Sequence, residues 1–182
     1  MGVIALPLPV MPILAAFSRH ETALAWARER AVEFWGPVAL ESPVFDFRET
    51  EYYAPAMGHG LKKIFWAYER LADPAELASW KRQTNQWEAD YNSQGIHPES
   101  RPLNLDPGYM TLGKLVLAST KDHAHRIYLH QGIYAEVTLV YQQRAWRTRE
   151  WTFPDFQRAD YHEFFNAARR LLAEHAKKDK SP

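Results

Sequence analysis

Apolar residues recur at helical spacing in three segments of the chain. The first segment follows Ser18, which has the capping-box spacing to Glu21, and it ends before Gly36-Pro37. The second begins at Asp73 and the third near Asp160. The expected inner faces are Leu24, Ala27, Ala31 and Phe34 in the first helix, Leu77, Trp80, Thr84, Trp87 and Tyr91 in the second, and Tyr161, Phe164, Ala168, Leu171 and His175 in the third.

Continuous or alternating apolar runs predict strands between these helices, at 13–17, 38–47, 61–71 and 126–141. The segment 109–120 is ambiguous, because Leu115-Val116-Leu117 suits a buried strand whereas Asp106-Pro107 suits the start of a helix. The order of elements matches a split βαβ arrangement. We therefore expect an α+β fold with a mainly antiparallel sheet and helices packed on one face. A β-hairpin and a C-terminal helix would extend its ferredoxin-like core, and the other face would be free or partly covered by that helix.

The hairpin at 126–141 has the best-determined register of these elements. His130-Gln131-Gly132 fits a three-residue loop with glycine in the left-handed region. This loop pairs Arg126 with Glu136, Ile127 with Ala135, Tyr128 with Tyr134 and Leu129 with Ile133. One face of the hairpin then carries Arg126, Tyr128, Tyr134, Glu136 and Thr138, and the other carries Ile127, Leu129, Ile133, Ala135, Val137 and Leu139.

Composition indicates one ordinary globular domain, because 46% of the 182 residues are hydrophobic and 24% are charged. We expect an extended leader at 1–9, one domain at 10–176 and a basic tail at 177–182. The leader is apolar, but no Lys or Arg precedes Arg19, and prolines at positions 7, 9 and 12 would break a hydrophobic helix. These features favour a cytoplasmic protein that has no membrane partner.

Charge balance and cysteine content disfavour or exclude several classes of function. The chain has 22 Lys and Arg against 22 Asp and Glu, and this balance disfavours a dedicated nucleic-acid binder while leaving room for a local basic groove. It contains no cysteine, which excludes thiolate catalysis, disulfides and cysteine-based metal centres. His123 and His125 have the spacing of a metal pair on a strand, yet no third ligand is fixed by the sequence, so we assign no metal site.

Several segments together resemble one known family. They are Tyr52-Tyr53, Met57-Gly58, Gly60-Leu61-Lys62, 104–109, 114–118, 120–122, 125–129, 132–139 and 151–155. On these segments the chain resembles the prokaryotic family catalogued as domain of unknown function 4416, over roughly residues 10–158. The resemblance implies a prokaryotic protein, and it supplies no activity, cofactor or site residue.

The polar face of the hairpin is the strongest candidate for a functional site. If it lies in a cleft, its charged and aromatic groups suit an anionic or nucleotide-like ligand, with Arg and Lys for phosphate and Tyr for stacking. The predicted catalytic residues are Asp106, His125 and Glu136, and the predicted ligand-binding residues are Lys114, Arg126, Tyr128 and Tyr134. If the face is exposed, its ion pair contributes only ~0.5 kcal/mol to stability.

Two functions are consistent with these patterns. The first is binding or processing of a phosphorylated or nucleotide-like small molecule at the polar cleft. The second is a non-catalytic module that binds RNA or a protein through the sheet face and a basic strand, where Arg144, Arg147 and Arg149 surround Trp146 and Trp151. Neither pattern identifies a reaction or a cofactor.

Overall fold

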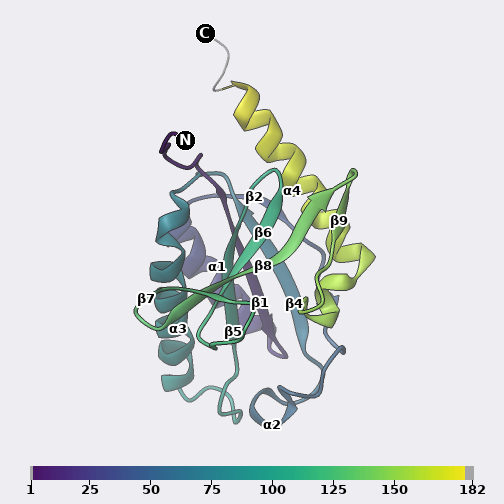
Figure 1. Cartoon of the computed structure of the whole chain (residues 1–182). Helices are drawn as coiled ribbons and strands as arrows, with labels where there is room; N and C mark the ends of the chain where they lie inside the picture. The colour runs from purple at the N-terminus through teal and green to yellow at the C-terminus, as the bar shows by residue number, and fades with distance from the viewer. Residues whose placement is uncertain (1, 179–182) are drawn as a thin grey trace.

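The strands form one antiparallel sheet in the computed structural model, which describes residues 2–178 (Figure 1). Within those residues the strands are β1 Met11–Ser18, β2 Val38–Glu41, β3 Phe45–Asp46, β4 Lys62–Tyr68, β5 Asn104–Met110, β6 Lys114–Ser119, β7 Ile127–His130, β8 Ile133–Gln142 and β9 Ala145–Arg147. Their order is β2-β4-β1-β5-β6-β8-β7, with β3 also pairing with β4 and β9 with β8. The α+β class with an antiparallel sheet is therefore confirmed, and the ferredoxin-like core stays a prediction.

Helices cover both faces of the sheet (Figure 1). The helices are α1 Glu21–Trp35, α2 Ala54–Met57, α3 Leu77–Ser93 and α4 Ala159–Lys178, with short 3₁₀ turns at Pro74–Glu76 and Pro154–Gln157. One apolar cluster joins α1 and α3 to the sheet, and a second joins α4 to the opposite face. The C-terminal helix thus covers part of the second face, which is one of the two arrangements that the sequence left open.

The buried faces of the helices follow the predicted spacing with local exceptions. All five predicted inner positions of α3 are buried. In α1 the prediction is wrong for Phe34, which is 43% exposed, because Trp35 is the residue that turns into the core. In α4, Leu171 and His175 are only half-buried, and Leu172 is buried beside them.

The predicted capping box at the start of α1 is wrong. The helix begins at Glu21, so Ser18 lies two residues before its N-cap His20 and at the end of β1. The hydroxyl of Ser18 instead accepts a hydrogen bond from the backbone N–H of His20 and donates one to the carbonyl of Pro102. Asp73, by contrast, does cap the turn that precedes α3.

The described residues near either end of the chain lie outside the sheet. Residues 2–9 form no helix or strand and are exposed, and β1 begins at Met11. At the other end α4 continues into the predicted basic tail as far as Lys178, and the rest of that tail, with Lys180, lies outside the described residues. Between residues 2 and 178, no helix has the length and apolar character that a membrane crossing requires.

The ambiguous segment 109–120 lies in two strands, β5 and β6, joined by a tight turn. These strands pair only from Gly108 to Met110 on β5 and from Leu115 to Leu117 on β6. At the closest point a Cβ on Gly108 would lie 2.3 Å from the carbonyl oxygen of Val116, so only glycine fits there. Beyond this point the strands diverge, since β5 continues along β1 while β6 continues along β8.

Two of the four residue pairs predicted for the hairpin are present in its strands. The pairs Ile127–Ala135 and Tyr128–Tyr134 are confirmed, but Ile133 pairs with His130 rather than with Leu129. The reason is a bulge in β7 combined with a two-residue turn, in which Gln131 and Gly132 have φ of 53° and 77°.

A second irregularity in the hairpin changes the face of β8 beyond Val137. The register between β6 and β8 shifts at this point, so Leu139 packs in the α4 cluster while Val137 packs against the α1 and α3 cluster. The predicted apolar face is therefore wrong at Leu139. Ile127 pairs with Ala135 and so lies on the predicted face, but its side chain is exposed because β7 is an edge strand.

Candidate functional site

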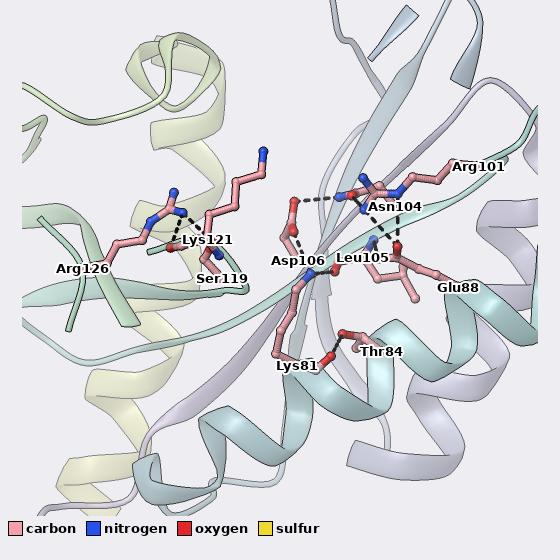
Figure 2. Close-up of polar contacts among 10 residues, drawn as sticks. All are labelled: Lys81, Thr84, Glu88, Arg101, Asn104, Leu105, Asp106, Ser119, Lys121 and Arg126. Atoms are coloured by element: carbon pink, nitrogen blue, oxygen red, sulfur yellow. Dashed lines mark hydrogen bonds and ion pairs between the residues drawn. The ribbon is translucent and has the colours of Figure 1, made fainter. Parts of the chain in front are cut away.

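A cavity of about 430 Å³ lies where β5 and β6 diverge. Its size falls in the range of about 300–1,000 Å³ that is usual for small-molecule sites. The cationic side chains that line it are Lys63, Lys81, Arg101, Lys121 and Arg126. The carboxylates that line it are Glu49, Asp106, Glu136 and Asp155. Two groups of these side chains face each other across the gap between the strands (Figure 2).

The first wall of the cavity is built by β5 and α3 around Asp106. Lys81 projects from α3 and donates to the backbone carbonyl of Leu105 at 2.7 Å and to Oδ1 of Asp106 at 3.1 Å. Asn104 donates to Oδ2 of the same carboxylate at 2.7 Å. Figure 2 shows Asp106 at the edge of this network, on the side nearest Lys121.

Arg101 extends the first wall toward the outside. Its guanidinium donates to Glu88 of α3 and to Asn104, and Glu88 also accepts from the backbone N–H of Leu105. Burial raises the pKa of Glu88, although Lys81 and Arg101 oppose that change. The network thus ties the loop before β5 to α3 and fixes the position of both wall cations.

Opposing effects set the pKa of the Asp106 carboxyl, and hence its charge. Burial raises the pKa of the carboxyl, but the ammonium groups of Lys81 and Lys63 and the hydrogen bond from Asn104 together lower it by more, so its pKa lies below the ordinary 3.8. Asp106 therefore stays ionised at neutral pH.

The depressed pKa predicts how Asp106 contributes to stability as pH changes. The contribution is fully present above the ordinary pKa and disappears as pH falls through the folded-state value. We expect Asp106→Asn to destabilise the protein by about 1–2 kcal/mol at pH 7. The difference from the wild type should shrink as pH falls below about 4 in urea unfolding. A difference that is constant with pH would contradict this account.

The second wall comes from the end of β6, from Arg126 just before β7 and from Glu136 within β8. Arg126 donates through Nε to Oε2 of Glu136 at 2.9 Å, and through Nη1 to Oγ of Ser119 at 2.6 Å and to the carbonyl of Lys121 at 3.1 Å. Both partners of the ion pair are buried, with side-chain exposures of 3% for Arg126 and 2% for Glu136. The pair is therefore a buried feature of the cavity wall, rather than the exposed cross-strand pair of the alternative interpretation.

Both oxygens of Glu136 are occupied. Oε2 lies 3.1 Å from Nε2 of His125 and also accepts from Arg126, while Oε1 accepts from the hydroxyl of Thr138. The ring of His125 stacks on Trp151 at a centroid distance of 5.3 Å. These contacts favour a role for Glu136 in holding the Arg126 guanidinium in place.

The floor of the cavity contains a buried ion pair. Lys63 of β4 donates to Asp155, and the side chains are only 4% and 5% exposed. The ammonium also lies within 6 Å of five aromatic ring centres, those of Phe17, Phe47, Phe65, Phe156 and Tyr161. Aromatic rings and one carboxylate thus stabilise a lysine that would be costly to bury alone.

The predicted site residues differ in their position relative to the cavity. Asp106, Arg126 and Glu136 line the cavity, and His125 contacts Glu136 from outside it. Lys114 lies at the far end of β6 and does not line the cavity. Tyr128 and Tyr134 pack on each other at 5.3 Å and are not part of its lining either.

Sequence reasoning missed six charged residues that line the cavity, Glu49, Lys63, Lys81, Arg101, Lys121 and Asp155. A signal for Lys63 did exist, because it lies within the strand-like run 61–71 at a position that the strand buries. Lys81 likewise adjoins Trp80 on the buried side of α3. Among residues 2–178, no group of three or more His, Asp or Glu side chains is arranged to hold a metal ion.

Comparison with known proteins identifies a family. A search of curated proteins and a search of solved structures each gave no significant match. The family described as Domain of unknown function (DUF4416) matches residues 9–171, which is most of the chain and includes every residue that lines the cavity. The chain therefore belongs to the DUF4416 family.

Proposed function

We propose that the cavity binds a small molecule that carries a phosphate group, and that Lys121 and Arg126 are the phosphate ligands. One observation carries the proposal. Two cationic side chains of the same wall have hydrogen-bond donors that no carboxylate of the described residues accepts. Lys121 forms no ion pair with a carboxylate in the part of the chain that the structure describes. In the same part, Nη2 of Arg126 makes no hydrogen bond, although its Nε and Nη1 are occupied.

The surroundings of these donors suit an anion. Glu136 and Ser119 hold the guanidinium of Arg126, so little side-chain entropy remains to be lost on binding. Five cationic side chains against four carboxylates line the cavity, which gives one net positive charge. Because the cavity is partly enclosed, this charge acts on a ligand through a lower dielectric than bulk water.

Processing of such a ligand would depend on the opposite wall. Asp106 is ionised, lies on the far side of the gap from Arg126, and is held by Lys81 and Asn104. It is therefore the cavity carboxylate that we propose as a general base. Glu136 and His125, which bind each other, would act by positioning Arg126.

A panel of phosphate esters tests the proposal by thermal shift. A ligand present at about 100 times its Kd should raise Tm by roughly 5–10 °C, whereas the parent alcohol should not. We expect Lys121→Gln to weaken binding about tenfold, because it removes one charge-assisted contact. Lys114→Gln is the matched control, since both lysines are exposed and flank the same strand.

Two results would contradict this proposal. One is the absence of any shift with the whole panel. The other is an equal loss of affinity in Lys121→Gln and Lys114→Gln. Salt-sensitive retention of RNA without any response to phosphate esters would support the alternative, non-catalytic module.

A further inference from the structure

Two large aromatic side chains at the cavity remain exposed. Tyr52 is 66% and Phe153 is 43% exposed, and both are among the residues that line the cavity. The rings on the floor, such as those of Phe17 and Phe156, are by contrast buried. Apolar burial therefore accounts for the floor but leaves Tyr52 and Phe153 exposed to solvent at the mouth.

Each exposed ring lies beside one of the proposed phosphate ligands. The ammonium of Lys121 is 4.5 Å from the ring centre of Tyr52 and 3.1 Å from its hydroxyl oxygen. The guanidinium carbon of Arg126 is 5.9 Å from the ring centre of Phe153. The two residues are themselves neighbours, since Nη1 of Arg126 donates to the backbone carbonyl of Lys121. The mouth thus runs from ring to cation to cation to ring.

This arrangement of rings and cations at the mouth matches the base and the phosphate of a nucleotide. A phosphate needs the cations, and a base needs a flat, accessible π face within a few ångströms of them. A phosphosugar would use the cations but would leave both rings exposed to water. The cavity volume of about 430 Å³ is within the usual range for one small ligand.

We infer that the ligand is a nucleoside monophosphate, whose phosphate binds Lys121 and Arg126 and whose base stacks on Tyr52 or Phe153 at the mouth. The inference rests on the proposed phosphate site and adds the class of ligand. It also assigns the stacking to the loop that precedes α2 and to the segment before the second 3₁₀ turn. Sequence reasoning had placed stacking on Tyr128 and Tyr134 of the hairpin, which do not line the cavity.

Calorimetric titration with nucleoside monophosphates and with ribose 5-phosphate tests the inference. Stacking should make at least one monophosphate bind about tenfold or more tightly than ribose 5-phosphate. Tyr52→Ala or Phe153→Ala should remove most of that advantage, and should weaken ribose 5-phosphate binding much less than monophosphate binding, since each ring also contacts one of the phosphate ligands. Tyr52→Phe keeps the ring and should retain the advantage. Tyr128→Ala is the control, because that residue is 58% exposed and outside the cavity.

The outcomes separate this inference from the proposed function. Equal affinity for ribose 5-phosphate and for every monophosphate would overturn the nucleotide assignment and leave the phosphate site standing. No binding of any phosphate ester would overturn both. Tighter binding of a 5′-phosphorylated oligonucleotide than of the mononucleotide would also overturn the assignment, because the ligand would then be a nucleic-acid end.

Discussion

Asp155→Ala is expected to lower the free energy of unfolding by about 3–5 kcal/mol. The substitution would leave the ammonium of Lys63 buried without a carboxylate, since the lysine side chain is only 4% exposed. The five surrounding aromatic rings offset part of this penalty, but cation–π contacts contribute only about 0.5–2 kcal/mol each and cannot replace a charged partner. Urea unfolding at pH 7, followed by circular dichroism, measures the change.

A double variant is the control for this prediction. Lys63→Met with Asp155→Leu removes both charges and keeps apolar volume in the floor, so it should recover most of the lost stability. If the single and the double variant were equally unstable, packing rather than the unpaired charge would be the cause. If Asp155→Ala were as stable as the wild type, the ion pair would not be a buried feature of the fold.

The second large effect is expected at Glu136→Ala, again about 3–5 kcal/mol. This carboxylate is the acidic partner of Arg126, and it also contacts His125 and Thr138, so its removal leaves three groups without their acceptor. The variant should also lose its response to phosphate esters, because the guanidinium is no longer held in the cavity wall. Chemical unfolding and the thermal-shift panel give the two readouts.

Glu136→Gln separates stability from binding at the same position. The amide keeps the shape of the side chain and one acceptor oxygen, so we expect a smaller loss of stability than with alanine. A Glu136→Ala protein that unfolds like the wild type would show that the Arg126 pair behaves as an exposed one. An Ala variant that still responds fully to phosphate esters would remove Arg126 from the site.

Local patterns allowed much of the fold to be predicted. The three long helices and the hairpin were visible because helical spacing, turn residues and strand parity are properties of neighbouring residues. The same parity predicted that Arg126 and Glu136 meet, and their side chains do bind. The two bulges were not visible, since they depend on what packs against each face of β8.

The cavity could not be predicted from local patterns, because it exists only where β5 and β6 diverge. Gly108 was visible as a glycine, but its role depends on the approach of Val116 from the next strand. Lys114 and Lys121 flank the same strand, and only the tertiary structure shows which of them lies at the cavity. Asp155 was equally hidden, because its partner is 92 positions away in the chain.

The most direct test of the proposed site is a crystal structure of the protein soaked with the phosphate ester that gives the largest thermal shift. The account predicts that the phosphate lies within hydrogen-bond distance of Nζ of Lys121 and Nη2 of Arg126, in the gap opposite Asp106. A phosphate bound elsewhere on the protein, with this gap filled only by water, would contradict it.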